Sequence, residues 1–159
     1  MVSNTQLMRM ALDLIKKEAF TPDADVPVGA LIVDSQGRII AESTNRKEKE
    51  KDPTAHAEIL VLRKAGGVTG SPNLSGLTLV VTLEPCAMCA GAIAQARVSR
   101  LVFGAWDSKA GAAGSKHDLV RDRTLPHRVS EVVGGVLERD CQEVLKDFFA
   151  TLKGSVDLD

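Results

Sequence analysis

Residues 77–97 read LTLVVTLEPCAMCAGAIAQAR, and this stretch decides the fold. Leu77 to Leu83 is nearly all apolar and rich in β-branched residues, which predicts a central strand. Pro85 suits the first turn of a helix, where its missing N–H costs nothing, and that helix is expected to run to about Arg97. Val98 to Ala105 predicts the next strand. Two strands with a helix between them predict a parallel pair joined by a right-handed crossover.

The flanking segments add helices and strands to this unit. The predicted elements are an amphipathic helix over 4–20 ended by Pro22, a strand over 28–33, a turn over 35–37, a strand over 38–43, a helix over 55–65 capped by Thr54 and ended by Gly66-Gly67, a short strand over 131–134, and a closing amphipathic helix that carries Cys141, Val144, Leu145, Phe148 and Leu152. Residues 106–128 show no clear period, so a loop with at most one short helix is expected there.

Alternation of strands and helices predicts an α/β fold with three layers, α/β/α, in one domain spanning residues 1–159. The expected core is a mixed, mostly parallel five-stranded sheet. Its first two strands should pair antiparallel as a hairpin, and the later strands should be parallel.

The composition is that of an ordinary globular protein. Of its 159 residues 44% are hydrophobic and 26% charged, which suits a single core. No apolar run approaches the ~20 residues of a membrane span, and no secretory signal is evident, so a cytoplasmic protein is expected. The net charge of −1 argues weakly against a nucleic-acid partner. Basic clusters at 46–51 and 116–128 are equally compatible with solvated surface and with such a partner.

His56 and Glu58, followed by Cys86 and Cys89, supply one imidazole, one carboxylate and two thiols. Imidazole and thiolate are ligands that Zn²⁺ prefers, and three protein ligands leave a fourth position open for water, as in catalytic zinc sites. Cys86 and Cys89 are three residues apart and are expected on one side of a helical turn. Glu58 should miss the metal, because residues two apart do not share a helical face. It is then free to move protons to and from water activated by the metal.

Two other interpretations of these residues exist. A structural zinc site needs a fourth ligand, for which His117, His127 and Cys141 are the free candidates, all far along the chain. A Cys-x-x-Cys sequence alone is also compatible with a redox pair, but that interpretation leaves His56 and Glu58 without a role. A catalytic zinc site is therefore favoured, and Cys141, on an apolar stripe, is interpreted as a core residue.

Several segments between Asp25 and Phe149 carry a resemblance to a known family. They include VPVGA at 26–30, NR at 45–46, DPTAHAE at 52–58, TLEPCAMCAGA at 82–92, VFGA at 102–105, Asp107, GAAGS at 111–115, HR at 127–128 and DFF at 147–149. The His-x-Glu and Pro-Cys-x-x-Cys motif marks a whole superfamily of zinc-dependent deaminases. The GAAGS and DFF segments are more particular. On these segments the chain resembles the bacterial tRNA-specific adenosine deaminases of the cytidine deaminase superfamily.

The resemblance implies a cytidine-deaminase-like fold and hydrolytic deamination of adenosine to inosine at the wobble position, A34, of a tRNA. One Zn²⁺ per subunit would be held by His56, Cys86 and Cys89, and zinc-activated water would attack C6 of a flipped-out adenine. Glu58 would protonate N1 and then the leaving ammonia. Further substrate contacts are expected from Asn45, Val26, Ala57, Asp107 and His127. The family implies a homodimer that binds the tRNA anticodon loop, without an organic cofactor or a membrane.

Two other functions stay open on the sequence. A zinc-dependent deaminase of a free base or nucleoside, such as cytosine, guanine or an analogue, would use the same zinc chemistry. A zinc-stabilised RNA-binding or scaffold protein without catalysis is the third hypothesis. Glu58 argues against the third, because such a protein needs no spare carboxylate beside its metal.

Overall fold

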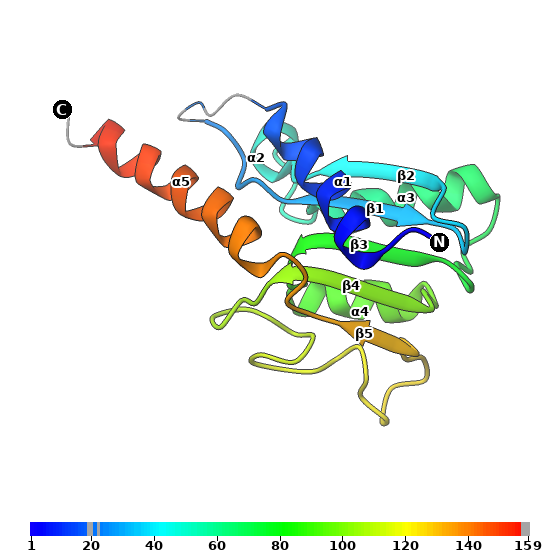
Figure 1. The fold of residues 1–159 in the computed structure, drawn as a ribbon. Coiled ribbons are helices and arrows are strands. Elements are labelled where there is room, and N and C mark those ends of the chain that lie inside the picture. The colour runs from blue at the N-terminus through cyan, green and yellow to red at the C-terminus, as the bar shows by residue number, and fades with distance from the viewer. Residues whose placement is uncertain (19–20, 22, 157–159) are drawn as a thin grey trace.

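The computed structural model describes residues 1–18, 21 and 23–156, and at its centre is a five-stranded sheet (Figure 1). The strands lie in the order β2 (Ile39–Thr44), β1 (Gly29–Val33), β3 (Thr78–Leu83), β4 (Arg100–Ala105) and β5 (Glu131–Val133). β1 pairs antiparallel with both β2 and β3, whereas β3 with β4 and β4 with β5 pair parallel. β1 alone runs against the other four strands, so the predicted mixed, mostly parallel sheet is confirmed.

Helices cover both faces of the sheet, as the three-layer prediction required (Figure 1). α1 (Asn4–Lys16) and the first part of α5 (Glu138–Val156) pack on one face, and α3 (Ala57–Thr69) and α4 (Ala87–Gln95) pack on the other. The rest of α5 extends away from the sheet.

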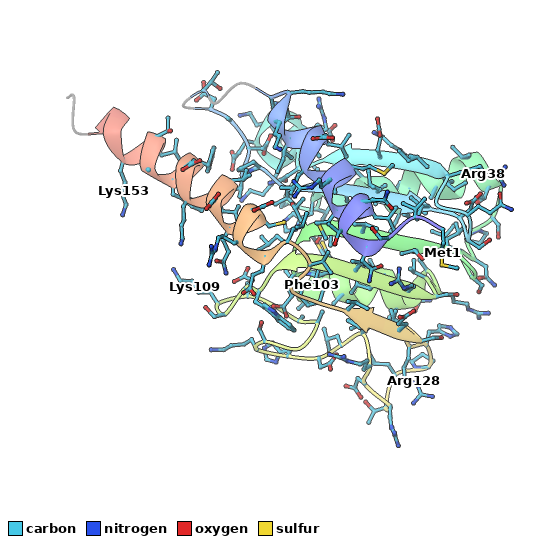
Figure 2. The ribbon with its side chains drawn as sticks, viewed as in Figure 1. Met1, Arg38, Phe103, Lys109, Arg128 and Lys153 are labelled. Atoms are coloured by element: carbon cyan, nitrogen blue, oxygen red, sulfur yellow. The ribbon has the colours of Figure 1, made fainter. Side chains whose placement is uncertain are left out.

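The central strands are buried on both faces, with side chains that alternate between two apolar clusters. Leu79 and Val81 of β3 face α3 and α4, whereas Val80 faces α1. Phe103 of β4 is fully buried and lies within the body of the sheet (Figure 2). This burial on both sides explains why residues 77–83 and 98–105 read as continuous apolar runs.

Two predicted boundaries of α3 are wrong. The helix begins at Ala57, with His56 as its N-cap residue, and not after Thr54. The Thr54 hydroxyl donates a hydrogen bond to Asp52 Oδ1 (2.7 Å), so it stabilises the preceding turn instead of capping a helix. The helix also continues through Gly66-Gly67 and ends at Thr69. Gly70 follows as its C-cap residue, with a φ of 69°, the left-handed conformation that glycine adopts at helix ends.

The boundaries of α1 and α4 also differ from the prediction. α4 begins at Ala87 with Cys86 as N-cap residue, so Pro85 precedes the helix and is not in its first turn. The Pro85 carbonyl accepts a hydrogen bond from Ala112 N (2.8 Å), which holds this part of the chain extended. The helix ends at Gln95, before the predicted Arg97. α1 ends at Lys16, and the predicted continuation to residue 20 and Pro22 falls partly outside the described residues.

A four-residue helix, α2 (Lys47–Glu50), was not predicted. The carboxylate of Asp25 accepts hydrogen bonds from Glu48 N (2.6 Å) and Lys49 N (3.3 Å) and so supports this turn from another part of the chain. Residues 106–128, all described, form an irregular loop as expected. Among the described residues, none of the helices has both the length and the apolar character that crossing a membrane requires.

Candidate metal centre

Three ligand-type side chains converge from the N-terminal ends of α3 and α4. His56 and Cys86 are the N-cap residues of the two helices, and Cys89 lies in the first turn of α4. His56 Nδ1 lies 3.7 Å from Cys86 Sγ and 3.5 Å from Cys89 Sγ. The ligand atoms of the three residues all lie within 4.8 Å of one another. The structure therefore brings together the three residues that the sequence predicts as metal ligands.

The spacing of these atoms fits a tetrahedral zinc ion. Zn–S bonds of about 2.3 Å and Zn–N bonds of about 2.0–2.1 Å, at a tetrahedral angle, put the nitrogen and sulfur about 3.6 Å apart. Within the described part of the chain no fourth histidine, cysteine or carboxylate belongs to this group. His127 instead contacts Arg97, with 3.4 Å between Nε2 and Nη2, and Cys141 is buried in the cluster formed with α1. Three protein ligands are the set expected of a catalytic zinc site.

Protonation of the three ligand residues is coupled. The hydrogen bond with Cys89, assisted by His56, lowers the pKa of the Cys86 thiol to about 4 despite its burial. The same contact with Cys86, together with burial, raises the pKa of Cys89 above its usual range. The hydrogen bond with Cys86 also raises the pKa of His56. The cluster thus favours a thiolate at Cys86 with protons on its two neighbours, and a divalent cation would displace those protons.

Glu58 lies in the first turn of α3 and is only 4% exposed, yet it does not belong to the ligand group. Burial raises the pKa of its carboxyl, and hydrogen bonds with its own backbone and with Cys89 act in the opposite direction. A buried carboxyl beside a metal site, next to a cavity, is a candidate for general acid–base catalysis.

A cavity of about 840 Å³ opens beside these residues. The residues that line it at the metal site are His56, Ala57, Glu58 and Cys86. Three more residues predicted to contact substrate, Val26, Asn45 and Asp107, lie in its wall. Asn45 is held in place, because its Nδ2 donates to Val26 O (3.2 Å) and its Oδ1 accepts from Lys47 N (3.3 Å). The cavity can therefore present an oriented amide to a polar ligand.

One residue predicted to contact substrate lies elsewhere. His127 belongs to the irregular loop, beside Arg97, and is not among the residues that line the cavity. Lys109 and Arg128 project outward from the same loop (Figure 2). Any ligand contact of His127 would thus involve a part of the ligand outside the cavity.

The outer wall of the cavity comes from elements that the sequence did not connect with the site. α2 contributes Lys47 and Lys49, and α5 contributes Phe148 and Phe149. The DFF segment at 147–149 gave a signal for the aromatic part of this wall. For the lysines of α2 the basic cluster at 46–51 was only an ambiguous signal, because their charges alternate with those of Glu48 and Glu50 in the sequence.

Most of the chain matches the model of a known protein family. Residues 1–105 match the model of the cytidine and deoxycytidylate deaminase zinc-binding region. This match contains the three ligand residues and Glu58.

The chain is similar to known proteins named tRNA-specific adenosine deaminase. The one from Haemophilus influenzae is 46% identical over 145 residues, which cover 91% of this chain and 82% of that protein. The one from Bacillus subtilis is 46% identical over 129 residues, which cover 81% of this chain and 79% of that protein.

Solved structures show the same fold. One, from a study of A-to-I editing by tRNA:A34 deaminases at the wobble position, is 45% identical with a TM-score of 0.70. The match covers 74% of this chain and 84% of that chain. A guanine deaminase from Nitrosomonas europaea has a TM-score of 0.78 at 24% identity, over 94% of this chain and 86% of that chain. At that identity the likeness concerns the fold alone.

Proposed function

Because this chain belongs to the cytidine and deoxycytidylate deaminase family, we propose that it catalyses hydrolytic deamination of adenosine to inosine at position 34 of tRNA. One observation supports this chemistry above all. His56, Cys86 and Cys89 meet at a cavity that is also lined by Glu58, a buried residue that is not among the metal ligands. The high identity to tRNA-specific adenosine deaminases over nearly the whole chain supports the choice of substrate.

In the net reaction, water replaces the exocyclic amine of adenine: a C–O bond forms at C6, the C–N bond breaks, and ammonia leaves. His56, Cys86 and Cys89 would hold a Zn²⁺ ion, which would polarise a water molecule and lower the pKa of that water toward ~7. Glu58 would accept one proton from the attacking water and deliver it to N1 of the base. It would then carry the remaining proton of the added oxygen to the amino nitrogen, which leaves as ammonia. Glu58 lies in the first turn of α3 and lines the cavity together with His56 and Cys86, which supports this role.

The walls of the cavity would hold the target nucleoside. We assign Asn45, Val26 and Ala57 to the nucleoside itself and Asp107 to its immediate neighbour, since all four line the cavity. His127, outside the cavity, would contact a nucleotide farther along the loop. An anticodon loop is a suitable substrate because unstacking a base costs least where the strand is already single.

Inosine formation on an anticodon stem-loop tests this function directly. The zinc-loaded protein is incubated with a stem-loop carrying A34 and with a matched one carrying G34, and inosine is measured by sequencing. Inosine at position 34 of the first RNA alone is expected. An unchanged A34 with fully loaded zinc would refute the proposed substrate. Ammonia release from free cytosine, guanine and adenosine, measured in parallel, would then identify a small-molecule deaminase.

We also propose a cytoplasmic homodimer that contacts its partner through the outer face of α4. This helix carries no charged residue, and Met88 on its outer face is 37% exposed. A Cβ at Gly91 would meet no atom within 4 Å in the subunit, so Gly91→Arg should leave the subunit folded. Light scattering should give twice the 17.0 kDa chain mass for the wild type and a shift to monomer for Gly91→Arg. A wild type that stays monomeric at all concentrations would contradict the dimer.

A further inference from the structure

We propose that Glu84 is a positioning residue: its carboxylate binds the backbone of residues 107–115 and thereby fixes one wall of the substrate cavity. The inference rests on the proposed function for its substrate. It goes beyond that function by assigning a role to a residue that lines the cavity but is neither a metal ligand nor the proposed proton carrier. It also gives a role to the GAAGS segment at 111–115, which the deamination chemistry leaves unexplained.

Glu84 follows β3 directly, two residues before Cys86, and is only 2% exposed. Its Oε1 accepts a hydrogen bond from Asp107 N (2.9 Å), and its Oε2 accepts from Ala113 N (3.0 Å) and Ser115 N (3.0 Å). The Ser115 hydroxyl also donates to Oε1. Four donors from one segment thus satisfy a buried charge that would otherwise be costly to desolvate.

The glycines of the GAAGS segment fit this contact. A Cβ at Gly111 would lie 2.4 Å from the Glu84 carboxyl, so the backbone can approach the carboxylate only where a side chain is missing. Gly114 has a φ of 135°, a conformation that residues with side chains rarely adopt, and it turns the chain back toward the carboxylate. The segment is therefore shaped to surround one acidic side chain of the same protein.

The alanines and the serine complete the arrangement. Ala112 and Ala113 belong to this loop and are fully buried, so a larger side chain at either position would not fit without displacement. Ser115 is the donor that reaches the carboxylate with both its backbone and its hydroxyl. Small apolar residues and one hydroxyl thus allow residues 111–115 to enclose the Glu84 carboxylate.

The segment that Glu84 holds also forms the cavity wall. Asp107 and Ala110 line the cavity, and Asp107 Oδ1 accepts hydrogen bonds from Lys109 N (3.0 Å) and Ala110 N (3.1 Å). Cys86 forms an isolated β-bridge with Gly111. The metal-ligand end of α4 and the cavity wall are therefore one hydrogen-bonded unit, and Glu84 is the side chain that joins them.

A purely structural role makes a different prediction from a positioning role. If Glu84 only stabilised the fold, its loss would lower the folded or zinc-loaded fraction, and kcat per zinc-loaded molecule and KM would stay unchanged. If it positions the wall, loss of its contacts should raise KM for an RNA that extends beyond the target nucleoside. Zinc content and kcat should then change little.

Glu84→Gln tests the proposal, because the glutamine amide puts an NH₂ group against backbone N–H donors. We expect full zinc content, an unchanged circular dichroism spectrum, and a KM for the A34 stem-loop raised roughly tenfold with kcat within about threefold of wild type. Ser115→Ala, a milder change that removes only the hydroxyl donor, should raise KM by about threefold. Ser99→Ala is the matched control: it removes a hydroxyl acceptor from Gly76 N (2.7 Å), outside the cavity, and should leave KM unchanged.

Hydrogen exchange gives a second readout that needs no RNA. The amides of Asp107, Ala113 and Ser115 should exchange faster in Glu84→Gln than in wild type and should be unaffected by Ser99→Ala. Unchanged KM and unchanged exchange in both Glu84→Gln and Ser115→Ala would overturn the inference. A loss of activity that merely follows loss of zinc would overturn it as well. A wild type without activity on the stem-loop would refute the proposed function, and hydrogen exchange would still decide the role of Glu84.

Discussion

Glu58 occupies a position where burial and proximity to the metal ligands coincide. It is in the first turn of α3, two residues after His56, and it lines the cavity and contacts Cys89 without belonging to the ligand group. The i to i+2 spacing predicted that Glu58 would not be a metal ligand, and the structure leaves Glu58 out of the ligand group. Its burial beside the ligand residues and the cavity is what makes Glu58 the candidate proton carrier.

Glu58→Gln should separate metal binding from turnover. Because Glu58 is outside the ligand group, the variant should retain one zinc per chain, while loss of proton transfer should lower kcat by roughly 10²–10⁴-fold. Zinc content by mass spectrometry and inosine formation measure the two effects. Glu42→Gln, which neutralises an exposed carboxylate on β2, is the control and should keep wild-type kcat. Full turnover in Glu58→Gln would remove this residue from the mechanism.

At the scale of elements, the strands were predicted more accurately than the helix ends. The apolar runs at 77–83 and 98–105 correspond to β3 and β4 within two residues, because strands buried on both faces require such runs. The N-terminal ends of α3 and α4 were displaced from their predicted positions. Neither N-cap residue, His56 or Cys86, makes a side-chain capping bond, so neither carries the usual local signal.

The contact between α1 and β1 depends on a glycine. A Cβ at Gly29 would lie 2.4 Å from the backbone oxygen of Ala11 in α1. Gly29→Ala should therefore push the helix from the sheet and destabilise the protein by about 1–3 kcal/mol. In thermal unfolding, the melting temperature should fall by about 2–4 °C for each kcal/mol of lost stability.

Gly67→Ala is the matched control for that substitution. Gly67 lies inside α3, and a Cβ there would meet no atom within 4 Å. Alanine is favoured over glycine in a helix interior by about 0.5–1 kcal/mol, so this variant should melt at the same or a higher temperature. A similar fall in melting temperature in both variants would show that close packing at Gly29 is not the cause.

At the scale of the whole molecule, the metal site depends on the complete fold. His56 and Cys86 are 30 positions apart in sequence, and the ion would join α3 to α4 on one face of the sheet. Such a site binds the native state in preference to the unfolded chain, so zinc should stabilise the whole protein.

Removal of zinc should therefore lower both stability and activity. At a free zinc concentration 100 times Kd the expected stabilisation is about 2.7 kcal/mol, and a chelator in excess should abolish it. Melting temperatures with and without chelator measure the effect. Cys86→Ser, which lacks one thiolate ligand, should be almost insensitive to the chelator. An equal chelator-induced shift in this variant and in wild type would show that the ion stabilises the protein at another site.

The sequence by itself determined the chemistry of this protein: the types of ligand, the free carboxylate and the alternation of strands and helices. These are local properties, since residue type, spacing within one turn and apolar runs do not depend on distant parts of the chain. Only the tertiary structure decided which distant segments meet. The strand order with β1 between β2 and β3, the contact of Glu84 with residues 107–115, the wall formed by α2 and α5, and the place of His127 beside Arg97 are such results. Apart from the β1–β2 hairpin, these contacts join segments 23 or more positions apart, so no local pattern in the chain encodes them.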